Sequence, residues 1–416
     1  MRVLFVHQNF PAQFRHLAPL LARRGDEVVA LTFNDPPAAP GTRVLRTRPK
    51  YDTGAAHPWA RDFDTKIIRA EATLRTASEL RGQGFVPDVI LAHPGWGDTL
   101  FLKDVWPESR LAIYCEFFYQ PRGSDIDFDP EFEFKEQPAE RAARTRLRNL
   151  PQRLHFDVAD AAISPTRFQA DTYPAEFRSR IMVCHDGIDT RVVRPARALP
   201  LRFASGKEIG PDDEVVTFVG RNLEPYRGFH IMMRALPELL RLRPEAQIVI
   251  VGREGNGYGQ AAPEGTSWKR VFLGEIAGRA DLSRVHFLGS LDYPNFLNVL
   301  RISKLHVYLT YPFVLSWSML EAMATGCAVL GSDTAPVREF IRDGETGVLT
   351  PFFDHQALAE RAAAMLADAA LRRRLGEAAR AAIVAAADLR SVVLPRQLAW
   401  IDALANAAPR AGAPPV

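Results

Sequence analysis

The chain has 416 residues, which is too many for one hydrophobic core of ordinary size and favours two domains. Apolar residues make up 47% of the chain, a fraction that excludes an intrinsically disordered protein. The formal net charge of only +3 argues against a protein that binds nucleic acid through bulk positive charge.

Strands and helices alternate along the first half of the chain. Residues 2–8 predict a buried strand, residues 12–25 a helix that ends at Gly25, and residues 26–33 a second strand. Such a β-α-β unit requires a parallel sheet. Further strands that end in polar residues are expected at 87–97, 109–119, 160–166 and 180–189.

The alternation starts again after residues 191–203, a stretch with prolines and arginines that we interpret as a linker. A strand, a helix and a strand are expected at 213–222, 228–244 and 246–252, and more strands at 284–290, 304–310 and 327–333. The tail is predicted to be helical from residue 355 to about residue 407.

The predicted fold class is therefore α/β, with two Rossmann-like domains that face each other across a cleft. The expected boundaries are 1–190 for the N-terminal domain, 191–385 for the C-terminal domain, and 386–416 for a last helix with a loose tail. Ligands of such sheets bind beyond the carboxyl ends of the strands, so the cleft is the expected site.

Three cysteines, Cys115, Cys184 and Cys327, lie far apart in apolar surroundings. They have no metal-ligand spacing, so buried reduced thiols are expected. The first residues contain only a short apolar run, unlike a signal peptide, and no apolar stretch is long enough to span a membrane. These features predict a soluble, cytoplasmic protein.

The stretch YPFVLSWSMLEAMATGCAVLGSD, residues 311–333, places one acid, Glu321, at the centre of an apolar segment. The pattern predicts a loop followed by a helix, whose N-terminus offers backbone N–H groups and partial positive charge to an anion. Ser316 and Ser318 are suitable N-cap residues. Glu321 has two interpretations: it forms a capping box with Ser318, or its carboxylate accepts both hydroxyls of a ribose.

Two arginines are expected near this helix N-terminus. Arg221 ends the first strand of the second half, and Arg227 begins the next helix beside Gly228. Two guanidinium groups facing a helix N-terminus would form a clamp for a diphosphate. The alternative is a solvated arginine pair near a surface turn.

These segments resemble the retaining GT-B glycosyltransferases of family 4. GRNLEPYRG (220–228) is similar to the family's G-R-x-x-x-x-K-G element, and FVLSWSMLEAMATGCAV (313–329) is similar to its E-x-x-x-x-x-x-x-E-A-x-A-x-G-x-P-V element. VCHDGID (183–189) and GSDTAPVREFIRDGETGVLT (331–350) also resemble segments of the family. The resemblance is continuous over roughly residues 180–370 and fainter before them.

The resemblance implies a nucleotide-sugar site in the second domain. The two arginines would hold the donor diphosphate, the glutamate the ribose, the amides of the helix N-terminus phosphate, and residues 289–291 would lie near the base. The donor-binding residues so implied are Arg221, Arg227, Gly289, Leu291, Phe313, Ser318, Met319, Leu320 and Glu321. The last helix would pack back onto the N-terminal domain, and neither a metal ion nor another cofactor is expected.

Three residues depart from the family pattern. Arg227 replaces a lysine, Asp186 replaces an asparagine, and Phe313 stands where the family has its first glutamate. That glutamate typically meets hydroxyls of the donor sugar, and phenylalanine cannot accept a hydrogen bond. The departure implies an unusual donor sugar, another group in that role, or a protein without turnover; the simple alternative is an apolar residue at a strand end.

The first domain is expected to bind the acceptor. Its first loop contains no G-x-G-x-x-G, which argues against a dinucleotide site. His93 and Glu116 each end a strand and are candidate catalytic residues beside Arg221 and Arg227. Glu116 would orient or deprotonate the acceptor hydroxyl. The alternatives are that His93 is an ordinary loop histidine and that Glu116 is a solvated acid.

The stretch SDIDFD, residues 124–129, contains Asp125, Asp127 and Asp129. This spacing could bind a metal ion, but we expect a solvated acidic loop, and no metal site is predicted.

A helix over residues 140–153 would place Arg141, Arg144 and Arg148 on one face. A solvated helix is expected. The alternative is a peripheral contact with an anionic membrane, at the inner face of the cell membrane, or with a phosphate-bearing lipid acceptor.

We therefore expect a retaining glycosyltransferase that moves a sugar from a nucleotide-sugar to a hydroxyl of a glycan, a lipid-linked molecule or a small molecule. A front-face mechanism without a metal ion fits best, because no carboxylate stands out as a nucleophile. Two rivals remain at this point: a sugar-nucleotide epimerase or phosphorylase of the same fold, and a catalytically inert nucleotide-binding scaffold.

Overall fold

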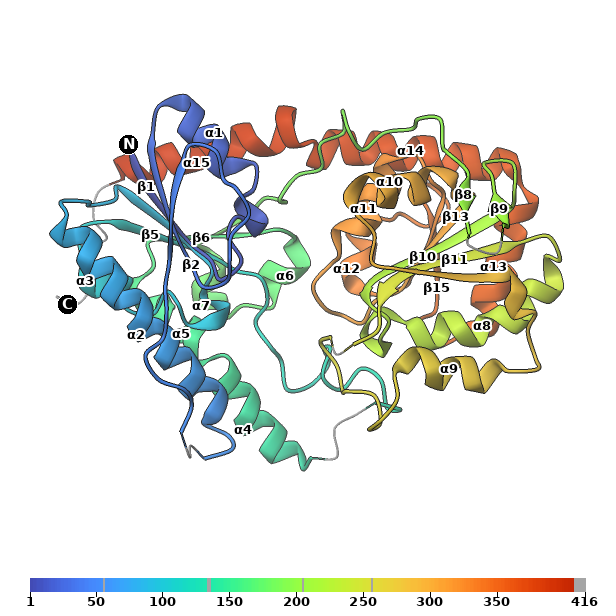
Figure 1. Ribbon diagram of the computed structural model, residues 1–416, viewed down its shortest axis with the longest axis horizontal. Coiled ribbons are helices and arrows are strands. Elements are labelled where there is room, and N and C mark those ends of the chain that lie inside the picture. Colours follow the sequence, from blue (N-terminus) through green and yellow to red (C-terminus); the bar gives the residue numbers. More distant parts are fainter. Residues whose placement is uncertain (55–56, 133–135, 204–205, 256, 408–416) are drawn as a thin grey trace. The chain divides into compact units, whose positions relative to one another are not determined.

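The computed structural model describes residues 1–54, 57–132, 136–203, 206–255 and 257–407 (Figure 1). By its internal contacts the chain forms two compact units. The first consists of residues 1–121, 136–187 and 390–416, and the second of residues 122–135 and 188–389.

A parallel sheet of seven strands forms the centre of the first unit, in the order β3-β2-β1-β4-β5-β6-β7. The strands are β1 (Arg2–Val6), β2 (Glu27–Thr32), β3 (Thr42–Arg46), β4 (Val89–Ala92), β5 (Arg110–Tyr114), β6 (Ala161–Ser164) and β7 (Ile181–Val183). The strands predicted in this half are confirmed, whereas β3 was not predicted. Val6 lies opposite both Leu31 and Ala92, so the residues that follow β1 and β4 leave the sheet at one edge.

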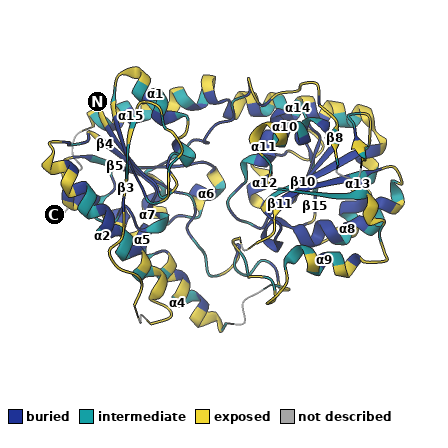
Figure 2. Ribbon diagram, viewed as in Figure 1, coloured by how far each residue is buried: buried dark blue, intermediate teal, exposed yellow. Residues whose placement is uncertain are grey.

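Apolar side chains cover both faces of this sheet, because successive residues of a strand point to opposite sides. Val3 and Phe5 belong to one buried cluster, whereas Leu4 and Val6 belong to another, together with residues of α2 (Arg61–Gly82). Figure 2 shows the buried strands and the exposed outer faces of the helices.

The last helix of the chain, α15 (Leu394–Asn406), packs against the first unit. Its Ile401 and Leu404 share a buried cluster with β1 and with α1 (Leu17–Arg24), so the predicted return of the last helix is confirmed. The other helices of this unit are α3 (Leu102–Val105), α4 (Pro138–Arg148), α5 (Leu150–Val158), α6 (Arg167–Asp171) and α7 (Ala175–Arg178).

The predicted helix over residues 12–25 is wrong in its first turn. Ala12–Phe14 form a short 3-10 turn instead, and α1 begins only at Leu17. Its end is as predicted: Gly25 adopts φ 98° and its amide donates to the carbonyls of the last turn. Glycine suits this left-handed conformation because it has no Cβ.

A second parallel sheet, of six strands in the order β12-β11-β10-β13-β14-β15, forms the centre of the second unit. Its strands are β10 (Val215–Asn222), β11 (Gln247–Arg253), β12 (Val285–Gly289), β13 (Leu305–Tyr308), β14 (Val329–Ser332) and β15 (Val348–Thr350). β8 (Leu201–Arg202) and β9 (Glu208–Ile209) form a small antiparallel pair. The predicted strands of this half are confirmed.

Seven α-helices belong to the second unit among the residues that the structure describes. They are α8 (Phe229–Leu242), α9 (Trp268–Ile276), α10 (Tyr293–Ile302), α11 (Trp317–Ala324), α12 (Ala335–Arg338), α13 (His355–Ala367) and α14 (Ala369–Ala387). A buried cluster joins Tyr308 and Val329 of the sheet to Met319 and Leu320 of α11 and to Ile383 of α14. The predicted helical tail is thus divided between the two units.

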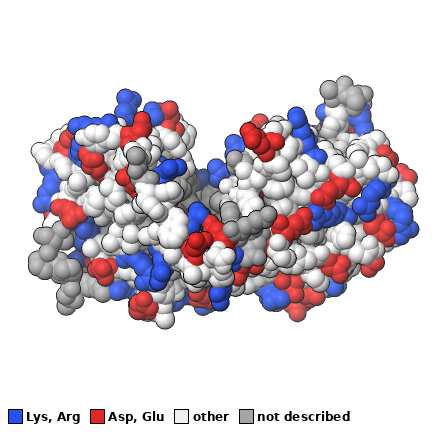
Figure 3. Space-filling model, turned by 90° about the horizontal axis from the view of Figure 1, so that it is seen from below, with Lys and Arg blue, Asp and Glu red and all other residues white. Residues whose placement is uncertain are grey.

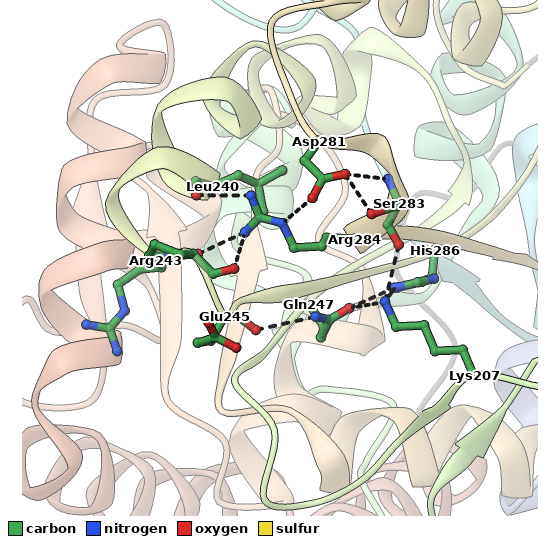
Figure 4. A network of polar contacts seen from close by, with 10 residues as sticks. Lys207, Leu240, Arg243, Glu245, Gln247, Asp281, Ser283, Arg284 and His286 are labelled. Carbon is green, nitrogen blue, oxygen red and sulfur yellow. Dashed lines mark hydrogen bonds and ion pairs between the residues drawn. The ribbon is translucent and has the colours of Figure 1, made fainter.

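A polar network fastens the amino-terminal edge of this sheet (Figure 4). Lys207 Nζ donates to Gln247 Oε1 at 2.8 Å, and His286 Nε2 lies 3.0 Å from the same oxygen. Arg284 caps the end of α8 by donating to the carbonyl of Leu240 at 3.2 Å. Because this network lies where β11 and β12 begin, the carboxyl ends of these strands belong to the opposite edge.

Residues 122–132, which we call the strap, pack against the second unit although they lie between β5 and α4 in the sequence. The hydroxyl of Tyr226 donates to Asp125 Oδ2 at 3.1 Å, and that of Tyr311 donates to Asp129 Oδ2 at 2.6 Å. Asp125 and Asp129 are only 1% and 4% exposed. The prediction of a solvated acidic loop is therefore wrong for these two residues, because tyrosine hydroxyls satisfy their carboxylates.

Three residues at the end of the strap have ligand atoms within metal-binding reach of one another: Asp129, Glu131 and His230. His230 Nε2 lies 3.0 Å from Asp129 Oδ2. Both oxygens of Glu131 accept hydrogen bonds of 2.7 Å from Arg234. A cation would have to displace this guanidinium, so these residues fit a network of polar contacts better than a metal site.

The three cysteines are buried and unpaired, as predicted. Within the described ranges, no helix is both long enough and apolar enough to cross a membrane.

Candidate functional site

Glu321 lies inside α11, and Ser316 is the N-cap of that helix. Ser316 Oγ accepts from the Ser318 amide at 3.4 Å, and the Ser316 amide donates to Tyr308 Oη at 2.9 Å. Ser318 is therefore a helical residue, and the capping box between Ser318 and Glu321 is wrong. Glu321, 5% exposed, instead accepts a hydrogen bond of 2.7 Å from the Tyr293 hydroxyl.

Arg227 is buried and joins the loop after β10 to the loop before α11. Its Nη1 donates to Thr310 Oγ1 at 2.9 Å and to the Val314 carbonyl at 2.8 Å. The next residue, Gly228, has φ 66°, and a Cβ there would lie 2.3 Å from Leu309 Cβ. Glycine thus allows the two loops to approach each other, and the approach brings Arg227 to the segment that leads into α11.

Arg221 is exposed at the end of β10, where it lines a pocket of about 360 Å³. Arg253, at the end of β11, and Tyr258 line the same pocket, as does the acid Glu254. Two guanidinium groups at one pocket favour an anionic ligand. Arg253 was not predicted as a site residue, although it directly follows the strand predicted over residues 246–252 and this position was a usable signal.

A buried carboxylate, Glu224, holds the glycine-rich loop beside this pocket. Glu224 Oε2 accepts from the amides of Tyr258 and Gly259 at 2.8 and 3.3 Å. Burial raises the pKa of Glu224, although these amides lower it in part. A Cβ at Gly257 would lie 2.0 Å from Glu224 Oε1, so the backbone approaches the carboxylate too closely for a side chain there. Glu224 therefore fixes where Tyr258 borders the pocket.

Phe313 is buried, with 2% of its surface exposed. Its ring centroid lies 5.5 Å from that of Tyr226 and 4.9 Å from that of Tyr258, and the Arg227 guanidinium carbon lies 5.9 Å from the ring. The position thus holds an aromatic cluster beside Arg227 and supplies no side-chain hydrogen-bond acceptor.

The remaining predicted donor residues contribute backbone or packing. Met319 and Leu320 are fully buried and pack in the cluster that joins α11 to the sheet. Gly289 ends β12 with φ 64°, and Leu291 packs against a buried cluster. The helix α10 begins two residues after Leu291 with Tyr293, which sequence analysis did not identify. It lies close to residues 289–291 in the sequence, and only the fold brings it to Glu321.

In the first unit, the structure brings His93 and Glu116 together. His93 Nε2 lies 3.6 Å from Glu116 Oε2. The His93 ring stacks on Trp96 at 4.4 Å, and its Nδ1 accepts from the Gly95 amide at 3.2 Å. Because Nδ1 is an acceptor, the proton of the neutral ring lies on Nε2, on the side of Glu116.

His7 is a second histidine at this edge, and sequence analysis missed it. It directly follows β1, as His93 follows β4, and the two ring centroids lie 5.1 Å apart. Its Nδ1 accepts from the Asn9 amide at 2.9 Å. Burial lowers the pKa of His7 to about 2, so the ring is neutral. His7 could have been predicted from the sequence, because it lies at the end of a predicted strand, as His93 does.

The arginines of α4 do not form one free basic face. Arg141 is buried, Arg144 forms an ion pair with Glu136, and the Arg148 guanidinium lies 3.5 Å from the centroid of the Tyr119 ring. Figure 3 shows basic and acidic side chains interspersed on the face that it draws. These contacts do not favour an anionic membrane as the partner of α4.

Two family models match the chain, one on each half. The model described as glycosyl transferase family 4 group matches residues 24–193, and the model described as glycosyl transferases group 1 matches residues 203–382. The chain belongs to the family 4 glycosyltransferases. This membership confirms the predicted family.

Curated relatives match part of the chain. D-inositol 3-phosphate glycosyltransferase of Mycobacterium avium (strain 104) is 32% identical over 223 residues, which are 53% of this chain and 49% of the relative. Phosphatidyl-myo-inositol mannosyltransferase of Mycobacterium leprae (strain TN) is 31% identical over 166 residues, 39% of each protein. The chain thus spans about half the length of the first relative and less of the second.

Solved structures match over nearly the whole chain. Sucrose-phosphate synthase from Thermosynechococcus elongatus has a TM-score of 0.73 at 19% identity, over 98% of this chain and 100% of its own. HepE from Anabaena, in complex with UDP, has a TM-score of 0.63 at 17% identity, over 97% of this chain and 100% of its own. These likenesses confirm the predicted GT-B fold with two Rossmann-like domains.

Proposed function

We propose that this protein is a retaining glycosyltransferase that moves a sugar from a nucleotide-sugar to a hydroxyl group. The acceptor is a glycan, a lipid-linked molecule or a small molecule. The reaction proceeds on the front face of the sugar and needs no metal ion.

One relationship carries the proposal: Arg227 is bonded to both ends of the loop that leads into α11. Its hydrogen bonds to Thr310 and Val314 hold a buried guanidinium beside the N-terminal end of a helix. Both groups attract negative charge, and both are fixed before a ligand binds. This is the electrostatic arrangement that stabilises a leaving diphosphate.

Each remaining donor group has a role that its chemistry supports. Arg221 supplies a second guanidinium to the diphosphate, and Glu321 accepts the ribose hydroxyls. The amides of Ser318, Met319 and Leu320 face phosphate, and residues 289–291 lie near the base. HepE was solved with UDP and with UDP-glucose, which makes uridine diphosphate the first nucleotide to test.

His93 and Glu116 serve the acceptor. The His93 Nε2–H faces the Glu116 carboxylate, an arrangement suited to orienting a hydroxyl group. The leaving phosphate then helps to remove the proton of this hydroxyl as the new bond forms on the same face of the sugar. This route gives retention without a covalent intermediate.

Thermal shift with UDP, GDP, ADP and their common sugar conjugates tests donor binding. A ligand at 100 times its Kd adds about 2.7 kcal/mol to the free energy of unfolding, which is readily detected. One nucleotide should stabilise the wild type, and Glu321→Ala should lose about 1–3 kcal/mol of its binding free energy. Glu360→Ala, an exposed acid of α13, is the matched control and should respond as the wild type.

Turnover separates the proposal from its alternatives. Release of the nucleoside diphosphate that depends on an added acceptor supports transfer, whereas binding without release indicates an inert scaffold. Conversion of the nucleotide-sugar without an acceptor indicates an epimerase. The anomeric configuration of the product, measured by NMR, then decides between retention and inversion.

A further inference from the structure

Tyr293 and Glu321 are joined across two helices of the second unit. The Tyr293 hydroxyl donates to Glu321 Oε1 at 2.7 Å, a short hydrogen bond to a carboxylate. Glu321 is 5% exposed, whereas Tyr293 is 39% exposed. A buried acid is therefore held by a side chain that itself reaches the surface.

The backbone at Tyr293 is fixed by the start of α10. Asp292 is the N-cap, and its Oδ1 accepts from the Asn295 amide at 2.9 Å. Tyr293 is the first helical residue, and its ring stacks on Phe296 with centroids 5.9 Å apart. These contacts limit where the hydroxyl can lie, so it is a rigid donor toward Glu321.

A rigid donor matters because the carboxylate of a glutamate rotates with little restriction about its last torsion. The hydrogen bond from Tyr293 selects one rotation before any ligand arrives. A carboxylate has about four acceptor positions, so a bond to tyrosine is compatible with bonds from a diol. Fixing the rotation in advance removes an ordering cost from binding.

We infer that Tyr293 is a positioning residue for ribose recognition: it orients the Glu321 carboxylate toward the two ribose hydroxyls. The inference rests on the proposed function, in which Glu321 binds the ribose. It adds a residue that lies outside the four sequence segments quoted for the resemblance and that is contributed by a different helix.

Discrimination between ribose and deoxyribose tests the inference directly. Calorimetry gives the Kd of UDP, 2′-deoxy-UDP and 3′-deoxy-UDP for the wild type and for Tyr293→Phe. The wild type should prefer UDP over the deoxy forms by about tenfold or more, on the scale of a hydrogen bond to a charged group. Tyr293→Phe should weaken UDP by about three- to tenfold and leave the deoxy forms within about twofold, so the preference collapses.

Two further variants separate positioning from general damage. In the double variant Tyr293→Phe/Glu321→Gln, the effects should not add, because the tyrosine acts through the glutamate. Tyr311→Phe removes another tyrosine–carboxylate bond of the same unit, the one to Asp129. It should lower stability yet keep the wild-type ratio of Kd values for UDP and its deoxy forms.

The outcomes are distinct. Unchanged Kd values of Tyr293→Phe for UDP and its deoxy forms overturn the inference and leave the proposed function in place. Equal loss of affinity for UDP and its deoxy forms also overturns it, because that pattern indicates a structural role. If the wild type binds none of UDP, GDP and ADP, the proposed function and this inference fail together.

Discussion

The hydroxyl of Tyr311 donates to Asp129 at 2.6 Å, and this bond fastens the strap to the loop that leads into α11. A second bond, from Tyr226 to Asp125, fastens the strap to the loop that carries Arg227. The two loops also contact each other, since the Tyr311 amide donates to the Tyr226 carbonyl at 3.0 Å. The strap therefore braces both loops of the candidate donor site.

Asp129→Asn should make this brace weaker in a pH-dependent way. Burial raises the pKa of Asp129, but hydrogen bonds from His230 and Tyr311 outweigh it and lower the pKa below the ordinary 3.8. A lowered carboxyl pKa stabilises the fold above the unfolded value, and the contribution is lost as the pH falls through the folded value. At pH 7 the variant should be about 1–3 kcal/mol less stable than the wild type. This difference in the free energy of unfolding should close below about pH 4, where Asp129 becomes protonated in the wild type. Urea unfolding across this pH range measures the difference between the two proteins. Asp127→Asn, which changes another aspartate of the strap, is the control.

Arg227→Ala should weaken binding of the nucleoside diphosphate by about tenfold or more, because it removes a charged donor from phosphate. Arg227→Lys should recover part of the loss, since the charge returns without the forked geometry. Arg241→Ala, an exposed residue of α8 paired with Glu238, controls for lost charge. Equal affinities of the wild type and Arg227→Ala would remove Arg227 from the diphosphate site.

Gly228→Ala and Gly274→Ala should have opposite effects on stability. A Cβ at Gly228 meets Leu309 at 2.3 Å and forces a residue at φ 66°, so the free energy of unfolding should fall by about 1–3 kcal/mol. Gly274 lies inside α9 with nothing within 4 Å of the added Cβ, so alanine should add about 0.5–1 kcal/mol there. Thermal unfolding of the two variants measures both effects. A Gly228→Ala variant as stable as the wild type would contradict the close approach of the loops.

His306 should make the protein less stable in mild acid. Burial lowers its pKa from 6.5 to about 3, so only the unfolded chain takes up the proton between these values. Stability is then lost as the pH falls below 6.5, by up to about 1.4 kcal/mol per pH unit from this residue. His306→Gln should flatten the slope between pH 6 and 4 relative to the wild type and to the exposed control His57→Gln. Parallel slopes would show that His306 does not cause the loss.

Local sequence patterns predicted much of the fold. Apolar runs marked the parallel strands, and Gly25 marked the end of a helix, because hydrophobic period and glycine conformation are properties of short segments. The same patterns misplaced the start of α1, where the residues from Ala12 form a 3-10 turn. They also left two interpretations of Glu321 open, since the spacing from Ser318 fits a capping box as well as a ligand site.

The sequence by itself determined the family and the two α/β halves, because these depend on the order of motifs along the chain. It also predicted which residues would meet a donor, and that assignment stays a prediction. Only the tertiary structure decided which residue caps α11, that Tyr293 holds Glu321, that His7 lies beside His93, and that Asp125 and Asp129 of the strap are buried. Each of these depends on a contact between segments far apart in the chain or on different elements. A carboxylate in a polar stretch looks the same in the sequence whether solvent or a distant tyrosine satisfies it, and the fold supplies that partner.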